Sequence, residues 1–309
     1  MKPRILLTGK DGQIGTDLRL FLPPLGDLVA LGSAEVNLAD AMALRRAVAD
    51  VRPDLIVNAA AYTAVDQAER EPSLAHAVNA QAPAVLAEEA KKVGAALIHF
   101  STDYVFDGSR ATPYTEADTP NPLSVYGASK LAGEQAVAAS GVPHLILRTA
   151  WVYARHGRNF LLTILRLAAQ QEELRVVRDQ VGAPAWSREV AAAISRILAS
   201  LPADLRPADA LRSATGLYHL AATGAASWHQ FAQAILEEAT SLPRLPAWAT
   251  AATQGHPLVA RLTPISTAEY PTAARRPAYS VLSSARIEKT FGVCLPDWRT
   301  QLRSVFQTV

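Results

Sequence analysis

The sequence predicts an α/β fold with a doubly wound parallel sheet, and three observations support this class. Within residues 1–150, short aliphatic runs alternate with longer segments of helical periodicity, which is typical of βαβ units. The aliphatic runs are continuous rather than alternating, as expected for strands that helices cover on both faces. The chain has 309 residues, of which 50% are hydrophobic and 19% charged, so it can bury a large core beside a smaller second region.

The elements expected in the first half follow from these runs in chain order. The strands are residues 4–8, 28–31, 54–58, 95–100 and 144–148. The Ala-rich segments between them that place apolar residues at helical spacing are 41–50, 73–92 and 125–139. A further helix begins in the glycine-rich segment that follows the first strand. Pro53 and Pro72 lie at element boundaries, where proline is tolerated.

Beyond residue 150 the pattern is looser. The elements expected there are a helix at 158–171, a strand at 174–178, and helices at 187–199 and 227–240. The segments 201–213 and 242–277 are rich in Pro, Ala and Thr, and we expect loops and short connections in them. This half therefore predicts the smaller C-terminal region.

Composition excludes several classes of protein. The net charge of +2 is too balanced for a nucleic-acid-binding surface or for an anionic membrane surface. The single cysteine, Cys294, can form neither a disulfide framework nor a thiolate metal site. The sequence contains neither a transmembrane-length apolar run nor the apolar segment of a signal peptide. We therefore expect a cytoplasmic protein with no nucleic-acid or membrane partner.

A glycine-rich turn, in the segment Thr8–Gly15, follows the first strand and opens the first helix. Gly9 and Gly12 permit a tight turn and let backbone N–H groups approach a pyrophosphate, while Gly15 lets the helix pack close to the sheet. An ordinary glycine turn is the simpler alternative. The position in the first βα turn, with further βα units behind it, favours a Rossmann-like dinucleotide-binding domain.

The end of the second strand indicates which coenzyme fits. A carboxylate at this point would bind the ribose 2′-hydroxyl and repel a 2′-phosphate. The strand ends in Ala30-Leu31-Gly32-Ser33, and the first carboxylate is Glu35. This end permits NADPH, with Lys10 or Ser33 as phosphate contacts, and leaves NADH open.

Tyr126 and Lys130 form a candidate acid–base pair. They lie four residues apart at the start of an expected helix, so both project from one face. A nearby ammonium lowers the pKa of a phenol, which then protonates a carbonyl oxygen while hydride reaches the carbon. A solvated lysine beside a packed tyrosine is the alternative. The segment Phe100–Gly108 favours catalysis, because it begins at the carboxyl end of the fourth strand and offers the Ser101 or Thr102 hydroxyl to the same oxygen.

On these residues the chain resembles the extended short-chain dehydrogenase/reductases and, within them, the dTDP-4-dehydrorhamnose reductase family, nearly end to end. The motifs that carry the resemblance are Gly9-Lys10-Asp11-Gly12-Gln13, residues 58–66, residues 101–108, Tyr126-Gly127-Ala128-Ser129-Lys130, residues 148–153, residues 179–184 and Arg276-Pro277. Several of these motifs are typical of the reductase family rather than of the whole superfamily.

The resemblance implies a role for each candidate residue. The catalytic residues would be Thr102, Tyr126 and Lys130. The residues that contact the coenzyme would be Gly9, Lys10, Gly12, Gln13, Ile14, Gly32, Asn37, Leu38, Ala60, Ala61, Thr63, Tyr126 and Lys130. The residues that contact the substrate would be Thr102, Asp103, Tyr126 and Trp151.

The resemblance also implies a reaction. NADPH, or alternatively NADH, would reduce the 4-keto group of dTDP-4-dehydro-β-L-rhamnose to give dTDP-L-rhamnose, a precursor of cell-surface polysaccharide. The NADP-binding Rossmann domain would cover residues 1–154 plus about 186–224, and the sugar-nucleotide-binding domain about 155–185 plus 225–309. Two other functions stay open: a nucleotide-sugar epimerase or dehydratase with tightly bound NAD, and a non-catalytic NADP-binding regulatory subunit.

One departure from the family concerns metal binding and assembly. Some relatives dimerise through a magnesium ion that glutamates hold, and the matching positions here are Asp17, Arg188 and Arg299. Two arginines cannot ligate a cation, so we expect no metal site and a monomer or weak homodimer. The seven histidines are scattered and give no helical ligand pair.

Overall fold

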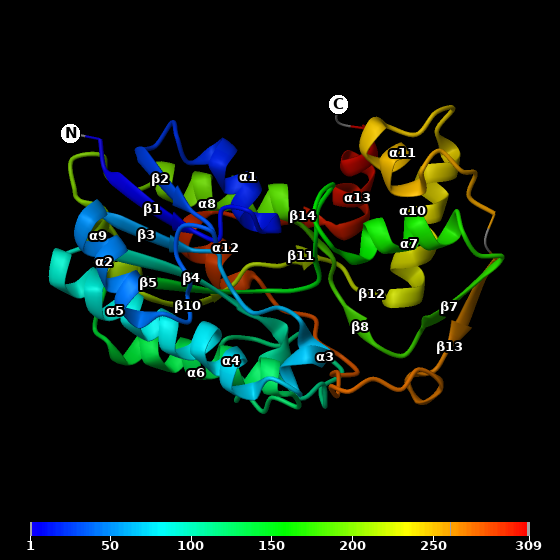
Figure 1. Ribbon diagram of the computed structural model, residues 1–309, viewed down its shortest axis with the longest axis horizontal. Coiled ribbons are helices and arrows are strands. Elements are labelled where there is room, and N and C mark those ends of the chain that lie inside the picture. Colours follow the sequence, from blue (N-terminus) through cyan, green and yellow to red (C-terminus); the bar gives the residue numbers. More distant parts are fainter. Residues whose placement is uncertain (1, 260, 308–309) are drawn as a thin grey trace.

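A six-stranded parallel sheet forms the centre of the protein, whose computed structural model describes residues 2–259 and 261–307 (Figure 1). In spatial order its strands are β2 (Asp27–Leu31), β1 (Arg4–Thr8), β3 (Leu55–Asn58), β4 (Ala96–Thr102), β5 (His144–Thr149) and β10 (Gly216–His219). Because β1 lies between β2 and β3, the direction of the crossovers reverses beside β1. In open α/β sheets, ligands bind beyond the carboxyl ends of the strands at such a reversal.

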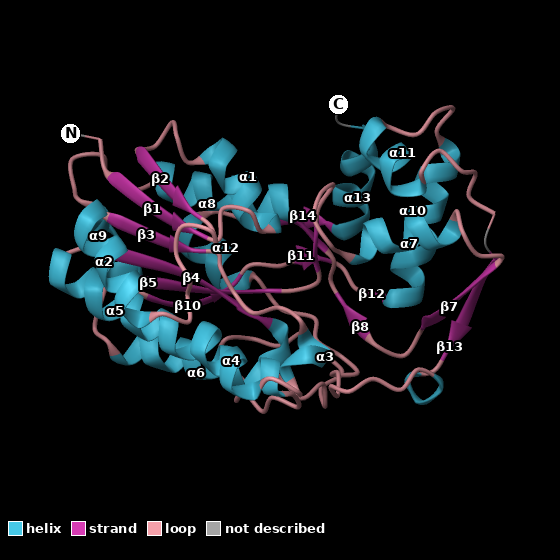
Figure 2. Cartoon of the chain, viewed as in Figure 1, coloured by secondary structure: helices cyan, strands magenta, loops and turns pink. Residues whose placement is uncertain are grey.

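Helices cover both faces of this sheet. α2 (Ala41–Val51), α5 (Ala82–Val93) and α6 (Val125–Ala139) lie on one face, and α1 (Gln13–Phe21) and α8 (Ser187–Ala199) lie on the other (Figure 2). Neighbouring strand residues serve opposite faces: Leu6 and Ile56 pack with the first set of helices, and Ile5 and Leu55 with the second. All four side chains are at most 1% exposed, which accounts for the continuous aliphatic runs in the sequence.

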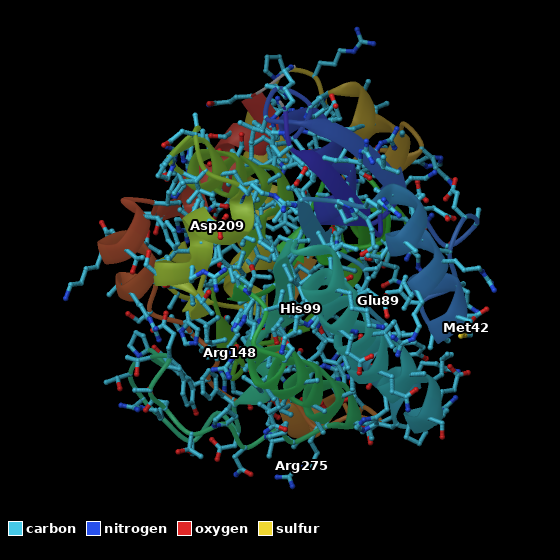
Figure 3. The ribbon with its side chains drawn as sticks, turned by 90° about the vertical axis from the view of Figure 1, so that its left-hand side faces the viewer. Met42, Glu89, His99, Arg148, Asp209 and Arg275 are labelled. Atoms are coloured by element: carbon cyan, nitrogen blue, oxygen red, sulfur yellow. The ribbon has the colours of Figure 1, made fainter. Side chains whose placement is uncertain are left out.

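Short elements connect the parts of this layer. They are α3 (Val65–Ala68), α4 (Pro72–His76), the π-helix Ala77–Gln81, the 3-10 helix Asp103–Val105, α9 (Pro207–Leu211), the 3-10 helix Arg212–Ala214 and α12 (Ala285–Phe291). A buried ion pair between Arg148 and Glu134, with contacts of 2.8 and 2.6 Å, joins β5 to α6. Figure 3 shows Arg148 and His99 in the interior of the layer, whereas Met42 lies at its periphery.

A second group of helices packs beside the sheet. It consists of α7 (Phe160–Ala168), α10 (Trp228–Ser241), α11 (Ala247–Thr253) and α13 (Trp298–Gln307). Around it lie four pairs of short strands and the 3-10 helix Thr267–Glu269. The pairs are β6 (Val152–Tyr153) with β9 (Ala185–Trp186), β7 (Glu173–Val177) with β13 (Arg261–Ile265), β8 (Val181–Gly182) with β12 (Ala226–Ser227), and β11 (Ala222–Thr223) with β14 (Leu295–Asp297). One hydrophobic cluster runs from strand residues such as Leu147 to Phe231 of α10, so the two groups share a core.

The predicted fold class is confirmed, and every strand expected in the first half lies within two residues of its expected ends. The prediction of one α-helix over 73–92 is wrong in its middle, where residues 77–81 form a π-helix. A π-turn carries one additional residue, and such turns are frequent at functional sites. The helix expected at 158–171 begins only at Phe160, because the Asn159 side chain caps it by accepting a bond from the Leu162 N–H.

Two predicted loops are wrong. Residues 201–213 contain α9 and most of a 3-10 helix, and residues 242–277 contain α11 and β13. Proline-rich composition misled the prediction, since Pro207 begins α9 in a position that proline favours, and Pro246 directly precedes α11. Strand β10 was also missed, because it has only four residues and forms an edge of the sheet. None of the helices within the described ranges is long and apolar enough to cross a membrane.

Candidate active site

The glycine turn between β1 and α1 brings three backbone segments into contact. Gly9 adopts a φ of +77°, which favours glycine, and its carbonyl accepts a 3.0 Å bond from the Gly12 N–H. A Cβ on Gly9 would lie 2.6 Å from the Ala60 nitrogen, and a Cβ on Gly15 would lie 1.9 Å from the Gly9 oxygen. Glycine is therefore required at both positions, and the turn, α1 and the segment after β3 form a cradle of bare backbone.

This cradle fits the pyrophosphate of a dinucleotide coenzyme. Gly12 is the N-cap of α1 and offers no side chain to the first helical N–H groups, which point to the carboxyl end of β1. Gln13 donates a 3.3 Å bond to the Val152 carbonyl, and its Oε1 is buried without a hydrogen-bond partner among the residues described. Ile14 packs its side chain into the core and leaves its backbone to the turn.

The charges at the end of β2 surround Gly32. Lys10 forms an ion pair with Glu35, which also accepts a 2.8 Å bond from the Gly32 N–H. The bond from Lys10, followed by the one from Gly32, holds the pKa of Glu35 below its usual value. A Cβ on Gly32 would lie 2.1 Å from Asp11 Oδ2. The predicted phosphate contact Lys10 thus already has a carboxylate partner, and a second carboxylate lies nearby.

Two further predicted coenzyme contacts lie just beyond this point. Asn37 accepts a 3.0 Å bond from the Ala39 N–H and so shapes the turn before α2. Leu38 packs against the cluster that α2 shares with the sheet. Both roles toward a coenzyme stay predictions.

A buried amide joins the segment after β3 to the helix that carries the predicted acid. Asn79 accepts a 2.8 Å bond from the Tyr62 N–H and donates 3.0 Å bonds to the Tyr62 carbonyl and to Ser129 Oγ. Ala60, Ala61 and Thr63 flank Tyr62, so this amide fixes the predicted coenzyme contacts relative to α6. Sequence reasoning missed Asn79, because an asparagine inside an Ala-rich helical segment carries no distinctive signal.

Lys130 is buried at the sheet. Its side chain is 2% exposed, and Nζ donates a 2.6 Å bond to the carbonyl oxygen of Phe100. Burial lowers the pKa of Lys130 to about 8, although Glu134 acts in the opposite direction. The ammonium therefore stays charged at neutral pH and is held where β4 approaches its carboxyl end.

Thr102 and Tyr126 meet at that carboxyl end. Burial raises the pKa of Tyr126 to about 12, the nearby Thr102 hydroxyl lowers it, and the charge of Asp103 raises it. The Tyr126 and Tyr104 rings pack edge to face, with 5.7 Å between ring centroids. The expectation that Lys130 brings the pKa of Tyr126 toward neutrality is wrong for this structure, because burial dominates and the ammonium is bound to the Phe100 carbonyl.

Asp103 lies directly behind this pair. Its carboxylate accepts a 3.1 Å bond from Thr102 Oγ1, and the residue is 2% exposed. Burial raises the pKa of Asp103 to about 6. Arg276, from the Arg-Pro motif near the C-terminus, donates a 2.6 Å bond to Asp66. Its side chain also borders Tyr104 and lowers the pKa of that phenol, although burial raises it more.

Trp151 follows β5 in an unusual backbone conformation, with a φ of +46°. Its ring stacks on Trp228 at the start of α10, with centroids 3.5 Å apart and planes within 3°. A Cβ on Gly182 would lie 2.4 Å from the Trp151 ring, so a glycine is needed beneath it. Sequence reasoning did not single out Trp228 as a site residue. The stack places it, from the other group of helices, beside the predicted substrate contact Trp151.

The positions that match the metal-bridging glutamates make contacts within the chain. Asp17 is buried and accepts a 2.5 Å bond from Ser187, which joins α1 to α8. The Arg188 guanidinium lies 5.7 Å from the Phe21 ring centroid, and that of Arg299 lies 4.7 Å from the Trp298 ring centroid. Across residues 2–259 and 261–307, no three His, Cys, Asp or Glu side chains gather as a metal site would require.

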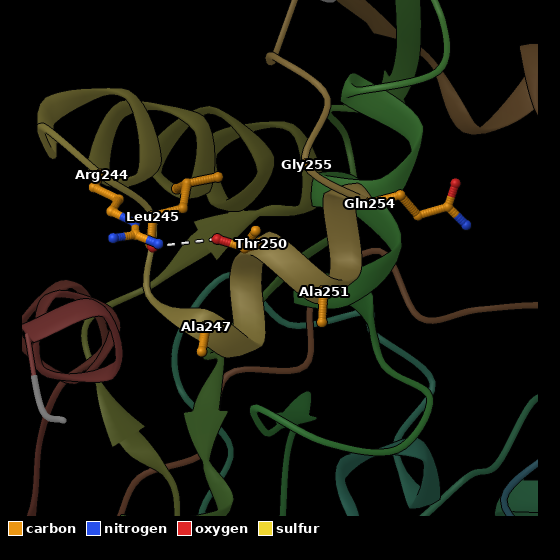
Figure 4. A pocket seen from close by; sticks show the side chains of 7 residues that line it. All are labelled: Arg244, Leu245, Ala247, Thr250, Ala251, Gln254 and Gly255. Carbon is orange, nitrogen blue, oxygen red and sulfur yellow. Dashed lines mark hydrogen bonds between the residues drawn. The ribbon is translucent and has the colours of Figure 1, made fainter.

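An open depression of about 640 Å³ lies away from these residues, around α11 and the segment before it (Figure 4). Arg244, Leu245, Thr250 and Gln254 contribute to its lining, and Thr250 donates a 3.2 Å bond to the Leu245 carbonyl. It contains no carboxylate, imidazole or phenol, so it offers no acid–base chemistry.

A backbone cradle at the reversal of a parallel sheet, next to a threonine, a tyrosine and a buried lysine, defines a Rossmann-like oxidoreductase that uses a nicotinamide dinucleotide. The family described as "RmlD substrate binding domain" matches residues 1–309. The chain belongs to this family, and the resemblance read from its motifs is confirmed.

Individual relatives agree with this assignment. The chain is 46% identical over 296 residues to dTDP-4-dehydrorhamnose reductase of Burkholderia thailandensis, covering 96% of this chain and 95% of the relative. It is 41% identical over 304 residues to the enzyme of the same name from Escherichia coli, covering 97% and 95%. Among solved structures, dTDP-4-dehydrorhamnose reductase of Bacillus anthracis in complex with NADP superposes with a TM-score of 0.87 at 33% identity, over 100% of both chains.

Proposed function

We propose that this chain catalyses the NADPH-dependent reduction of the 4-keto group of dTDP-4-dehydro-β-L-rhamnose, which yields dTDP-L-rhamnose. Membership of the family and the names of its close relatives support this reaction. The structural observation that carries it is the approach of Thr102 to Tyr126 at the carboxyl end of β4. Two hydroxyl groups at this edge of the sheet suit a carbonyl oxygen that becomes an alcohol.

The cradle and the segments around it would hold the coenzyme. The residues in this role are Gly9, Lys10, Gly12, Gln13, Ile14, Gly32, Asn37, Leu38, Ala60, Ala61, Thr63, Tyr126 and Lys130. When bound, NADPH supplies the hydride that adds to C4 of the sugar. The solved relative in complex with NADP supports NADPH as the coenzyme, and the pairing of Lys10 with Glu35 leaves NADH as a second one.

Tyr126 acts as the general acid. With a pKa of about 12 the phenol is fully protonated at neutral pH, so it enters the reaction with a proton to give. The alkoxide that forms on reduction is a much stronger base than a phenolate, so the proton moves from Tyr126 to the sugar oxygen. The protonated phenol is the form that reduction of the keto group requires.

Lys130 and Thr102 support this proton transfer in different ways. The Lys130 ammonium, one helical turn from Tyr126, stabilises negative charge that appears on the phenol as its proton leaves. When its hydrogen points to the substrate, Thr102 donates a hydrogen bond to the developing oxyanion, an effect worth about 3 kcal/mol in comparable sites. Asp103 is hydrogen-bonded to Thr102, and Trp151 packs on the same hydrophobic cluster as Leu131 of α6; both would contact the deoxysugar.

The decisive experiment is a direct assay of the purified chain. Nicotinamide absorbance is followed with the keto-sugar nucleotide and either NADPH or NADH, and the sugar product is identified by mass spectrometry and NMR. Consumption of added NADPH with formation of dTDP-L-rhamnose supports the proposal. A protein that purifies with stoichiometric NAD and isomerises or dehydrates the sugar without consuming coenzyme would overturn it, and so would coenzyme binding without turnover.

We further propose how the chain is organised around this reaction. Residues 1–154 plus about 186–224 would form the NADP-binding domain, and about 155–185 plus 225–309 the sugar-nucleotide-binding domain. Because Arg188 and Arg299 stand where a bridging metal would need acidic ligands, the enzyme would be a monomer or weak homodimer. Sugar nucleotides and reduced nicotinamide coenzymes are metabolites of the cytoplasm, where we place the reaction.

A further inference from the structure

The Thr102 hydroxyl is hydrogen-bonded to two neighbours, one that accepts its hydrogen and one that donates to its oxygen. Thr102 ends β4 and donates a 3.1 Å bond to Asp103 Oδ1, while its Oγ1 accepts a 3.2 Å bond from the Tyr104 N–H. Thr102 is 5% exposed and Asp103 is 2% exposed, so water does not compete freely for either group. A hydroxyl has one hydrogen to donate and two lone pairs that accept.

This arrangement restricts what Thr102 can do when Asp103 is ionised. A carboxylate only accepts hydrogen bonds, so the single hydrogen of Thr102 is committed to Asp103. One lone pair of Oγ1 is occupied by the Tyr104 N–H, and only the other is left for Tyr126 or a substrate. In this state Thr102 accepts a bond from a neighbouring hydroxyl and gives none to a keto oxygen.

Protonation of Asp103 reverses this restriction. A carboxylic acid has a hydrogen of its own, which it can donate to the free lone pair of Thr102. The Thr102 hydrogen is then released, and it can point to the sugar oxygen together with the hydrogen of Tyr126. The developing oxyanion then receives two hydrogen bonds instead of one.

Both protonation states are accessible near neutral pH. Burial raises the pKa of Asp103 to about 6, against the lowering effect of the Ser280 and Thr102 hydroxyls. The titratable groups that face it are the phenols of Tyr104 and Tyr126, which are neutral in this range.

The cations of Lys130 and Arg276 are bound to groups other than Asp103. Lys130 on α6 donates to the Phe100 carbonyl, and Arg276, in the segment that borders Tyr104, donates to Asp66. The carboxylate of Asp103 is therefore stabilised by hydroxyl groups and by backbone N–H groups, and the hydroxyl groups include the one whose hydrogen the reaction needs.

We propose that Asp103 is a pH-dependent positioning residue, which directs the Thr102 hydrogen to itself when ionised and to the sugar oxygen when protonated. This inference rests on the proposed function. Asp103 keeps its proton through the reaction, and the proton that reaches the sugar oxygen still comes from Tyr126.

The first test compares single-turnover rates of reduction at pH 5.5 and pH 8. The wild-type rate is expected to fall roughly tenfold to hundredfold between them, with an inflection near pH 6, because one oxyanion donor is lost. In Asp103→Asn and in Thr102→Val the ratio of the two rates is expected to be close to one.

Asp107→Asn is the matched control from the same segment. Hydrogen bonds, of which the one from Asn121 has the largest effect, hold the pKa of Asp107 well below its usual value. Asp107 therefore stays ionised at both pH values, and the Asp107→Asn enzyme should keep the wild-type ratio of rates. An Asp103→Asn enzyme that keeps the wild-type ratio overturns the proposal.

A second measurement does not depend on turnover. The infrared carbonyl band of protonated Asp103, assigned by its loss in Asp103→Asn, is titrated in the wild type and in Thr102→Val. Removal of the Thr102 hydrogen bond should move the midpoint upward, and an unchanged midpoint overturns the proposal. If the midpoint moves but no keto sugar is reduced at any pH, the coupling between the two residues holds and the proposed function fails.

Discussion

The Lys130 ammonium donates a 2.6 Å hydrogen bond to the carbonyl oxygen of Phe100, which ties the charge of α6 to β4 one turn away from Tyr126. The bond holds the cation against β4 and leaves it surrounded by protein. A buried charge that serves a reaction destabilises the folded state. The lowered pKa of Lys130 reflects this destabilisation.

Lys130→Met should therefore gain stability and lose activity. The pKa falls from 10.5 in the unfolded chain to about 8 in the folded one, a difference worth about 3 kcal/mol, and the lost bond to Phe100 offsets about 1 kcal/mol of it. The folded state binds fewer protons between pH 8 and 10.5, so the destabilisation is complete below pH 8 and disappears as the pH rises through 10.5.

Urea unfolding of Lys130→Met is expected to show a free energy of unfolding about 2 kcal/mol above wild type at pH 7, with the gain shrinking at pH 10. Lys92→Met is the control, since the Lys92 side chain is 63% exposed and pairs with Glu89. Equal stability of Lys130→Met and wild type at both pH values would contradict the assignment of a strained buried charge.

Tyr126→Phe should separate chemistry from coenzyme binding. Loss of the phenolic proton is expected to lower kcat roughly 10²- to 10⁴-fold, whereas the Kd for NADPH, measured by fluorescence, should change less than about threefold. The matched control is Tyr153→Phe, because the Tyr153 hydroxyl is buried without a hydrogen-bond partner among the residues described, and its removal should leave kcat near wild type. A Tyr126→Phe enzyme with near-normal kcat would remove Tyr126 from the mechanism.

Glu35→Gln should increase the preference for NADPH over NADH. Lys10, Asp11 and Glu35 together carry one negative charge beside Gly32, and the substitution brings that sum to zero while it releases Lys10 for a 2′-phosphate. The Kd for NADPH is expected to fall roughly threefold to tenfold, and the Kd for NADH to change less than about twofold.

Glu88→Gln serves as the control for this shift. Glu88 also forms a surface ion pair, with Arg45, but on the helix α5 rather than at the coenzyme turn. Both variants are titrated calorimetrically with NADPH and with NADH. If the ratio of the two dissociation constants changes equally in Glu35→Gln and Glu88→Gln, the change is a general charge effect and the prediction for Glu35 is wrong.

Gly15→Ala should disrupt the cradle. The added Cβ would lie 1.9 Å from the Gly9 oxygen, so α1 must move away from the turn. We expect the free energy of unfolding to fall by about 2–4 kcal/mol and the affinity for NADPH to fall at least roughly tenfold. Gly255→Ala is the control, since Gly255 has a φ of +77° but open space around its Cα; it should lose about 1 kcal/mol and keep its coenzyme affinity.

Local patterns predicted the sheet and the glycine turn well, because each depends on neighbouring residues. Continuous aliphatic runs such as 4–8 require burial on two faces, and Gly9 is needed for a positive φ. Contacts between distant residues were not visible in this way. The stack of Trp151 on Trp228 joins residues far apart in the chain, and Asn79 acquires its function only because Tyr62 and Ser129 come to lie beside it.

The direction of the Tyr126 pKa shift was missed for a related reason. Spacing places Lys130 on the same helical face, but it does not reveal that the ammonium is bound by the Phe100 carbonyl or how little water reaches the phenol. Electrostatic arguments from spacing alone therefore found the correct groups and misjudged the balance between charge and burial.

The late position of β10 in the chain has a consequence for biosynthesis. When β5 leaves the ribosome, about 70 residues must still be made before β10 can pair with its open edge. At ordinary translation rates this takes roughly 4 to 14 seconds. During that interval the nascent polypeptide exposes the unpaired edge of β5, which can pair with other chains. We therefore expect aggregation to be a greater risk during synthesis than after folding. Chaperones that bind nascent chains should increase the yield of folded protein but should have little effect on the stability of the folded state.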